Sequence, residues 1–573
     1  MPGFFVSDQQ TRFKLHNRYP QRCIDEAMVC PAGTFRRNTL NKFLDDKAFT
    51  ETDTLIVAAE GYLLNKDALF QQYSVRNVAE LIQTMYTRNG ETFFADFRGA
   101  FSGALFDKAR NKWLVYTNHT GDKPVFYACH GSSFAAGSQV NYVLDCCREL
   151  GWTLSFNESS AYQMLTFGFM ESDDTYAREI RRLLGGTYLC IEDGTAEVRR
   201  YFRLEKHPER FSGCTEDEII DALDAEFRRT VDAEYKKDEE YGLKHLADIS
   251  GGLDSRMNMW VAHELAPKHM QLLTYCKANY LDEIIAKKIA AYWKDELLAK
   301  QLDDASFLYE IDEITAMNAG LSLYCGITGG KQMLEAVNMD RYGLEHTGQI
   351  GDVVIGSFIK SPEELVNRAF SGRYSGRLSR RLSGEYAASF DDHELYLMET
   401  RALHGAANTH LIRENYTEVA SPFMNVDLLQ LCMDIPLELR MNHRLYKKWI
   451  LTKYPEAAQF PWEKTGARIT EGKFLGTLRK IVTRGPTKLL RMLGKDSLSS
   501  RSMNPLDYWF ARDTALQDYL NGYEARGYCC LPGASEQLIS DMKQLYATGT
   551  FSEKAMVLTV LAAAKLYFGE PNE

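Results

Sequence analysis

The sequence predicts a mixed α/β fold with two different parts, and two observations carry this prediction. Up to about residue 204, strand-like runs such as TLIVAAEGYLL (54–64) and KWLVYT (112–117) indicate a β-rich layer with helices. Beyond it, strands alternate with helices and the first strand ends in a glycine-rich turn, which is typical of a doubly wound parallel sheet. Ligands of such sheets bind at the carboxyl ends of the strands.

Helices are expected in both parts. TLNKFLDDK (39–47) and SVRNVAELIQTMY (74–86) are the helical candidates of the first part. In the second part, the apolar residues of segment 216–235 recur at helical spacing and predict one buried face, and YLDEIIAKKIAAYW (280–293) predicts a further helix. MVLTVLAAAKLYF (556–568) is the most apolar run, but it is too short and too interrupted to span a bilayer. We therefore expect a core helix there.

The composition is that of an ordinary globular chain. Of its 573 residues, 45% are hydrophobic and 25% are charged, so a sizeable core is expected. The net charge of −11 argues against non-specific nucleic-acid binding as the main task. The twelve cysteines include no CxxC pair, which excludes a zinc framework and favours reduced thiols in a cytoplasmic protein. The N-terminal residues show no signal-peptide pattern.

The most informative motif is the run Ser250-Gly251-Gly252-Leu253-Asp254-Ser255, which comes directly after the predicted strand LKHLADI (243–249). The glycines let the backbone approach a ligand closely, and a helix start aims N–H groups at an anion. The serine hydroxyls can donate to phosphate oxygens, and Asp254 can hold a magnesium ion that neutralises them. The run therefore predicts a pyrophosphate cradle, distinct from the Walker loop because no Gly-Lys-Ser/Thr comes after it.

This run resembles the pyrophosphate loop of enzymes that split ATP into AMP and pyrophosphate, and among these it is most similar to the asparagine synthetase family. Other segments resemble the same family, and the resemblance is nearly full-length, weakening after about residue 475. These segments are MPGFF (1–5), FRGAFSGALFDKARNKWLVYTNHTGDKPVFY (97–127), MLTFGFM (164–170), 178–204, TGQIGD (347–352) and EVASPFMNVDLLQLCMDIP (418–436).

The resemblance implies two domains. Residues 1–204 would form a degenerate class II glutamine amidotransferase-like domain, an α+β sandwich of the N-terminal-nucleophile (Ntn) hydrolase type. Residues 205–573 would form the asparagine synthetase-like domain, an α/β doubly wound PP-loop ATP pyrophosphatase fold with a helical C-terminal part.

The first domain departs from the family at its expected catalytic positions. The family nucleophile is a cysteine that becomes residue one after methionine removal, and this sequence has Pro2, which offers no thiol. The family's Asn-Gly pair, which stabilises an oxyanion, reads Glu60-Gly61, and a carboxylate there would repel the oxyanion. The Ser-Asp pair that binds the glutamine amine reads Arg76-Asn77. We predict that this domain does not hydrolyse glutamine.

The second domain keeps the residues that the family uses for ATP. Asp254 and Asp352 match its metal ligands, which bridge magnesium to pyrophosphate, and Gly348 belongs to the same ATP-binding turn as Asp352. Lys448, in RLYKKWILTKYP, matches the Lys-x-Ile-Leu motif and is expected to contact phosphate as a point charge, although its neighbour Lys447 is an alternative match. The implied cofactors are ATP and Mg²⁺.

Two further positions concern catalysis. Lys464, in FPWEKTGARI, matches the lysine that reaches the acyl-adenylate oxyanion during amide formation. Gln349 stands where asparagine synthetases have glutamate and β-lactam synthetases have tyrosine, and glutamine can orient a group but cannot act as a base. Glu385 and Glu394 lie at plausible separations for a base, and the sequence selects neither.

A basic segment covers residues 464–501, with ten lysines and arginines, and it also has apolar residues at helical spacing. The simpler interpretation, which we favour, is a basic surface helix pair with a closing loop. The alternative is peripheral contact with an anionic carrier, a membrane surface or a leader peptide.

Together these features predict a cytoplasmic, ATP-dependent and AMP-forming amide ligase that adenylates a small-molecule or carrier-linked carboxylic acid and couples it to an amine whose source is not glutamine. β-Lactam synthetases and lasso-peptide cyclases are relatives with the same kind of degenerate first domain. No nucleic-acid partner is expected. The alternatives are an ammonia-dependent asparagine synthetase, which Gln349 disfavours, an inactive scaffold, and a chain processed to start at Cys23 or Cys30, which would regain glutaminase activity.

Overall fold

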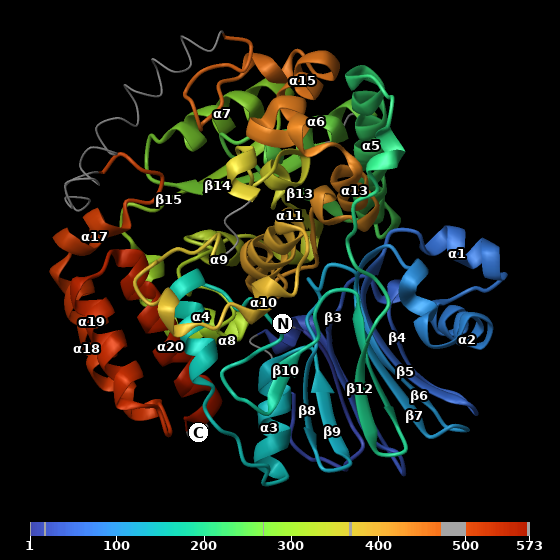
Figure 1. Cartoon of the computed structure of the whole chain (residues 1–573). Coiled ribbons are helices and arrows are strands. Elements are labelled where there is room, and N and C mark those ends of the chain that lie inside the picture. The colour runs from blue at the N-terminus through green and yellow to red at the C-terminus, as the bar shows by residue number, and fades with distance from the viewer. Residues whose placement is uncertain (1, 16–18, 267–268, 366–369, 472–499, 570–573) are drawn as a thin grey trace.

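The computed structural model describes residues 2–15, 19–266, 269–365, 370–471 and 500–569. Its first part contains two six-stranded sheets of antiparallel strands (Figure 1). One sheet has the order β10 (Ile180–Arg182), β8 (Phe126–His130), β9 (Ser133–Gly137), β1 (Gly3–Ser7), β3 (Gly33–Leu40), β2 (Cys23–Cys30). The other has the order β12 (Thr195–Arg200), β11 (Thr187–Glu192), β7 (Lys112–Thr117), β6 (Gly99–Asp107), β5 (Leu55–Leu63), β4 (Ala48–Glu51).

The two sheets pack face to face and carry helices on their outer faces. Phe4 and Val6 of β1 share a buried cluster with Trp113 of the other sheet, whereas Phe5, on the opposite face of β1, packs in a cluster with Val143 of α3. This alternation is the period of two expected for a strand. The outer face of the second sheet is covered by α1 and α2 (Figure 1). The helices of this part are α1 (Lys66–Tyr73), α2 (Val78–Asn89), α3 (Val140–Glu149) and α4 (Glu158–Phe167).

The second part is built on a five-stranded sheet in which all neighbouring strands are parallel. The strand order is β15 (Glu296–Gln301), β14 (Met270–Cys276), β13 (Lys244–Asp248), β16 (Tyr342–His346), β17 (Val419–Ala420). Chain order runs outward in both directions from β13, as in a doubly wound sheet. The helices near this sheet include α5 (Glu216–Glu240), α6 (Asp254–Leu265), α7 (Leu281–Trp293), α9 (Gly330–Glu335), α12 (His410–Arg413), α13 (Val426–Asp434) and α15 (Arg444–Lys453).

The last part of the chain is helical and packs on both other parts. α20 contacts α4 of the sandwich and α8 of the second part, and one hydrophobic cluster contains residues of all three (Figure 1). No helix among the described residues is long and apolar enough to cross a membrane. The remaining described helices are α8 (Ile311–Asn318), α10 (Glu385–Ala388), α11 (His393–Leu397), α14 (Leu437–Arg440), α17 (Leu506–Arg512), α18 (Thr514–Gly527), α19 (Glu536–Thr548) and α20 (Phe551–Phe568).

Most predicted elements are present, and one is wrong. The predicted strands 54–64 and 112–117 are β5 and β7, and segment 556–568 lies in the buried helix α20. The helix predicted at 39–47 does not form, because its first two residues belong to β3 and pair with β2. Phe43 then has φ of 53°, which ends any regular helix, and only a short 3-10 turn comes after it. The predicted boundary at residue 204 falls in the connection between β12 and α5.

Candidate active site

The glycine-rich run lies at the point where the parallel sheet reverses its strand order. It connects the carboxyl end of β13 to α6, and the turn 347–351 leaves the carboxyl end of the neighbouring strand β16. In doubly wound sheets this position forms the ligand crevice. Leu253, the N-cap residue of α6, supplies no side-chain hydrogen bond, so the first N–H groups of α6 are not capped by its side chain.

Hydrogen bonds fix the shape of the run. The Ser250 N–H donates to Ser255 Oγ (3.0 Å), and the Gly252 N–H donates to Ser250 Oγ (3.1 Å). The buried Gly251 N–H donates to Asp282 Oδ1 (2.9 Å), which ties the run to the start of α7. A loop held in this way presents its serine hydroxyls and the start of α6 to a ligand without having to reorganise.

Two glycines press the turn 347–351 against α6. A Cβ on Gly348 would lie 2.2 Å from the Ser255 nitrogen, and a Cβ on Gly351 would lie 2.8 Å from the Asp254 Cγ. No other residue type fits so close to the backbone. This packing brings Asp352 next to Asp254, although the two are far apart in the sequence.

The paired carboxylates fit a divalent cation. Burial and the negative charge of Asp352 raise the pKa of Asp254 to about 8, and the Tyr446 hydroxyl donates to its Oδ1 (2.8 Å). Two oxygen ligands of like charge beside a phosphate-binding turn are the donor set that Mg²⁺ prefers. Asp254 and Asp352 would therefore hold the ion, as the sequence predicts.

Two cavities meet at this place and share Asp254, Gly348 and Gln349 in their walls. We call the first the loop cavity; it has a volume of about 200 Å³ and its lining includes Ser250, Gly252 and Ser255. We call the second the large cavity; it has a volume of about 660 Å³ and its lining includes Asp352 and Lys464. The predicted phosphate-binding run and the predicted catalytic lysine thus face adjoining spaces.

Lys464 lies in the large cavity beside a histidine that the sequence did not single out. Its Nζ is 2.9 Å from His443 Nε2 and 5.3 Å from the ring centre of Trp462. Burial, and then the charges of Lys464, Lys447 and Lys360, lower the pKa of His443 to about 4, so its ring is neutral and accepts a hydrogen bond from Lys464. His443 also has φ of 60°, a backbone strain of the kind that occurs at functional sites.

The structure does not bring Lys448 to either cavity, and this corrects the prediction that it contacts phosphate. Its Nζ lies 2.8 Å from Asp217 and 3.1 Å from Glu216 at the protein surface. Lys447, the alternative match, lies close enough to His443 to lower its pKa. Adjacent residues of a helix point about 100° apart, so Lys447 and Lys448 project in different directions, and neither lines either of the two cavities.

The other candidates for catalysis have clear positions. Gln349 borders both cavities, and its side-chain amide donates to the Ala406 carbonyl (2.7 Å). Glu394 is buried and paired with Arg440 (2.7 Å), and Glu385 does not line either cavity. Neither glutamate is therefore placed to remove a proton from a substrate in these cavities.

The wall of the loop cavity contains Asp248, from the predicted strand 243–249, and Arg413, which the sequence analysis missed. Arg413 is 2.9 Å from Asp248 and is paired with Glu345, both at or near the carboxyl ends of central strands. Burial raises the pKa of Glu345 to about 8, and the charge of Asp248 adds to the rise while that of Arg413 opposes it. The polar character of strand 243–249 was the only signal for this group.

In the first domain, a buried ion pair lies near the start of β1. Gly3 lies opposite Asn38 in the antiparallel register of β1 and β3, and Thr39 is the next residue of β3. The Thr39 hydroxyl donates to Glu60, and Lys47 lies 3.7 Å from Glu60. Glu60 thus faces a lysine between the sheets.

The pair Arg76-Asn77 lies elsewhere, which corrects its assignment to the same pocket. Asn77 caps α2 by accepting from the Glu80 N–H (2.9 Å), and Arg76 is exposed. Helix α2 covers the outer face of the sheet that contains β5, where Val57 and Ala59 point. Glu60 comes next after Ala59 in β5, so it points to the opposite face, between the two sheets.

The same charges continue across the domain interface. Lys47 lies 3.3 Å from Glu418, and Lys123 pairs with both Glu418 and, at 3.4 Å, Glu414. All four side chains are buried. Lys123 belongs to the segment 97–127 and Glu418 to the segment 418–436, so two separate family-like motifs meet in one interdomain ion pair.

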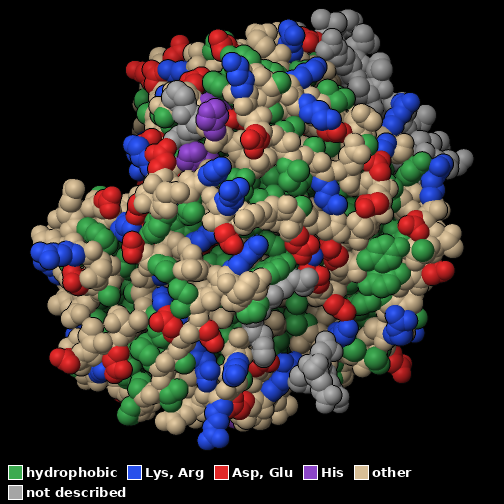
Figure 2. All heavy atoms as spheres, turned by 180° about the vertical axis from the view of Figure 1, so that it is seen from behind, with side chains coloured by type: hydrophobic (Ala, Val, Ile, Leu, Met, Phe, Trp, Pro, Cys, Tyr) green, Lys and Arg blue, Asp and Glu red, His purple; other side chains and the backbone are tan. Residues whose placement is uncertain are grey.

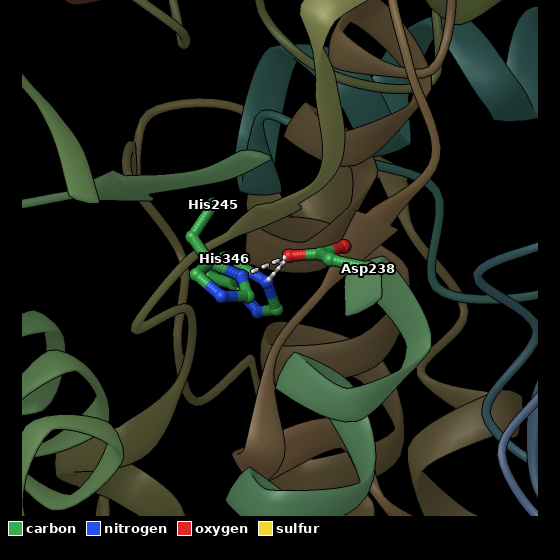
Figure 3. Close-up of side chains that lie close together, drawn as sticks. All are labelled: Asp238, His245 and His346. Atoms are coloured by element: carbon green, nitrogen blue, oxygen red, sulfur yellow. Dashed lines mark hydrogen bonds and ion pairs between the residues drawn. The ribbon is translucent and has the colours of Figure 1, made fainter. Parts of the chain in front are cut away.

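Another buried cluster, formed by Asp238, His245 and His346, could suggest a metal centre, since its ligand atoms lie within 4.8 Å of one another (Figure 3). His245 Nδ1 and His346 Nε2 each lie 2.8 Å from Asp238 Oδ2, and the Leu344 N–H donates to Oδ1 (2.7 Å). These bonds saturate the carboxylate, so a structural ion pair accounts for the cluster.

The basic segment cannot be placed, because residues 472–499 lie outside the described residues. On the face shown in Figure 2, lysine and arginine side chains lie among aspartate and glutamate side chains. The predictions of peripheral contact through 464–501 and of no nucleic-acid partner stay predictions. The twelve cysteines, all within the described residues, are free.

Comparisons with known proteins found a domain family and several curated relatives. Residues 49–202 match the family described as a glutamine amidotransferase domain. The chain is 24% identical over 234 residues to asparagine synthetase B (glutamine-hydrolyzing) of Escherichia coli strain K12, covering 39% of this chain and 35% of that protein. It is 21% identical over 412 residues to putative asparagine synthetase 1 (glutamine-hydrolyzing) of Methanocaldococcus jannaschii, covering 68% of this chain and 66% of that protein.

The matches are partial in length. The chain spans about a third of the length of the first relative. It is also 24% identical to asparagine synthetase 2 (glutamine-hydrolyzing) of Bacillus subtilis strain 168, a match that covers 38% of this chain and 30% of that protein. Among solved structures, glutamine phosphoribosylpyrophosphate amidotransferase from B. subtilis covers 48% of this chain and 67% of its own at 11% identity. Its TM-score of 0.23 is too low to support an argument about fold.

Proposed function

We propose that this chain is a C–N ligase of the asparagine synthetase family that cleaves ATP to AMP and pyrophosphate, adenylates a carboxylic acid and couples it to an amine not taken from glutamine. The observation that carries the proposal is the meeting of two cavities at Asp254, Gly348 and Gln349. One cavity has the phosphate-binding run and the other has Lys464. A carboxylate in the large cavity would thus lie beside the phosphates of a nucleotide in the loop cavity.

On the nucleotide side, the chain supplies a preformed anion site. The Ser250 and Ser255 hydroxyls and the start of α6 would bind the β- and γ-phosphates, a role for which the PP-loop of the family is named. A magnesium ion on Asp254 and Asp352 would neutralise phosphate charge and help pyrophosphate to leave. The acid then loses no proton in the first step, because its carboxylate oxygen attacks the α-phosphorus directly.

On the acid side, Lys464 would act when the amine attacks. The carbonyl oxygen of the adenylate gains negative charge at that stage, and an ammonium group in a partly desolvated cavity stabilises it. The hydrogen bond from Lys464 to the neutral ring of His443 would hold the ammonium in place. AMP leaves with the bonding electrons as the amide forms, and the amine loses a proton.

The amine source is inferred from the first domain. The position expected for the cysteine nucleophile has Pro2, and Glu60, at the position expected for the oxyanion pair, is buried as the partner of Lys47. Proline offers no nucleophile, and a carboxylate disfavours an oxyanion beside it. These features support an amine that arrives as a substrate of its own.

The test is product analysis with ATP, a panel of carboxylic acids and hydroxylamine as the amine. We expect AMP and pyrophosphate, with no ADP, for any acid that reacts. Asp254→Ala should lower the rate by at least about a thousandfold, because uncompensated phosphate charge is costly in a desolvated site. Lys448→Ala should change it by less than about threefold, since a surface ion pair contributes little. Formation of ADP, or an active Asp254→Ala protein, would refute the proposal.

A further inference from the structure

The large cavity carries more positive charge than the proposed reaction needs. Its lining includes three cations, Lys360, Arg401 and Lys464, and its acidic residues are Asp254 and Asp352. Those two carboxylates are the candidate metal ligands. Lys464 has a role at the developing oxyanion, whereas adenylation and amide formation give no task to Lys360 and Arg401.

These two cations belong to exposed residues on the wall of the large cavity. Among the described residues, neither Lys360 nor Arg401 forms an ion pair. The Arg401 guanidinium lies 4.5 Å from the ring centre of Phe358, which also lines the cavity. Lys360 lines the same cavity, so both cations border one space.

Three like charges around one cavity repel one another and favour an anionic occupant. A substrate ammonium group would need a carboxylate partner, and the described lining leaves none once Asp254 and Asp352 hold a cation. The charge pattern therefore selects against an amino acid whose amine remains protonated.

The cavity also has room for a bulky substrate. Its volume of about 660 Å³ lies in the range of roughly 300–1,000 Å³ that holds larger ligands. Part of its wall comes from the first domain, where Gly168 and Phe169 come after α4, and Tyr374 and Leu323 add apolar surface. The Tyr374 N–H donates to the Thr166 carbonyl (2.9 Å), which fixes this wall across the domain interface.

We propose that the acid substrate carries a second anionic group, a carboxylate or a phosphate, which Lys360 and Arg401 bind while the reacting carboxylate lies beside Asp254, and that it has no ammonium group. This inference rests on the proposed function. A carboxylate and a phosphate both present clustered anionic oxygens. The guanidinium of an arginine binds such oxygens in a bidentate way, and the ammonium of a lysine binds them as a point charge.

Four acids with the same six-carbon skeleton test whether a second anionic group favours binding and an ammonium group disfavours it. Gluconate has one anionic group, and glucarate has two carboxylates. The compound 6-phosphogluconate has a carboxylate and a phosphate, and glucosaminate has a carboxylate and an ammonium group. Each is titrated by calorimetry into the full chain with Mg²⁺ and α,β-methylene-ATP. We expect glucarate or 6-phosphogluconate to bind about tenfold more tightly than gluconate, and glucosaminate more weakly than gluconate. Which dianion binds better identifies the second group.

Variants show whether the named cations are responsible. Lys360→Gln and Arg401→Gln should each remove most of the dianion preference. Lys453→Gln, which removes a charge paired with Asp221 on the outside of α15, should keep it. The inference is wrong if glucosaminate binds as well as the dianions, if neither dianion binds, or if the preference survives in the Lys360→Gln/Arg401→Gln double variant. Dianion binding without pyrophosphate exchange for any acid would instead contradict the proposed function and leave the charge assignment intact.

Discussion

The buried ion pairs between the domains and the large cavity use the same kinds of residue in opposite ways. In these ion pairs, Lys47 and Lys123 are buried and each lies against glutamates of this chain. In the large cavity, Lys360 and Arg401 face open space and pair with no described residue. The buried ion pairs connect the two domains, whereas Lys360 and Arg401 are free to bind a ligand.

This difference gives a physical criterion for distinguishing charged residues that stabilise the fold from those that bind a ligand. A buried charge whose partner belongs to the chain is satisfied when the chain folds, and removing that partner costs stability. A charge left facing a cavity contributes little to folding, and its removal should affect binding instead. Three predictions apply this criterion, in order of decreasing effect.

Lys123→Met should cause the largest loss of stability. It leaves Glu414 buried without a cation and leaves Glu418 with Lys47 as its remaining cation, which costs about 3–5 kcal/mol in the free energy of unfolding. Urea denaturation of the full chain measures this loss, and Arg401→Gln is the matched control, with an expected change of less than about 0.5 kcal/mol. A second change, Glu418→Gln, should restore part of the stability lost in Lys123→Met. Equal effects of Lys123→Met and Arg401→Gln would remove the distinction between the two regions.

Lys464→Ala should separate the two chemical steps. With an acid that supports exchange, labelled pyrophosphate should still enter ATP, while amide formation falls by about a hundredfold, the usual effect of losing an oxyanion donor. Lys464→Arg should not restore the rate, because a planar guanidinium cannot replace a compact ammonium beside His443. Equal loss of exchange and amide would instead assign Lys464 to phosphate binding, and an unaffected variant would make it a solvent-exposed charge without a catalytic role.

The His346–Asp238 pair should make stability depend on alkaline pH. Burial alone lowers the pKa of His346, but Asp238 raises it from 6.5 to about 9. A raised pKa stabilises the folded state fully below pH 6.5, and this contribution is lost as the pH rises through about 9. We expect the free energy of unfolding to fall by roughly 3 kcal/mol across that range. His346→Gln should be less stable at pH 6 and show a flatter profile; identical slopes would contradict the assignment.

The fold could be predicted wherever the local pattern and the long-range packing agree. The apolar face of segment 216–235 became part of α5, and the run after β13 formed the expected turn into α6. Segment 39–47 could not be predicted in the same way, because its ends are decided by pairing between β3 and β2, which depends on residues well outside the segment.

The site could be predicted where one short motif supplies several groups. The run 250–255 and the turn 347–352 do so. The glycines of the turn indicate the close packing that places Asp352 beside Asp254. Lys360, Arg401 and His443 come from separate segments with no shared spacing, so only the fold brings them together. Lys448 lies in the helix that its motif predicts, but on a face that points away from both cavities. The motif match therefore located the helix but not the side chain that would face a ligand.

The shared core beneath α20 limits how this chain can change over evolutionary time. α20 buries its side chains against both α4 and α8, so the first and last thirds of the sequence complete a single apolar interior. A gene that lost residues 1–204 would expose that interior to water, at a cost of about 25 cal/mol for each Å² of apolar surface. Point mutations can therefore erase the chemistry of the first domain, but deletion of the domain would also unfold the rest of the chain.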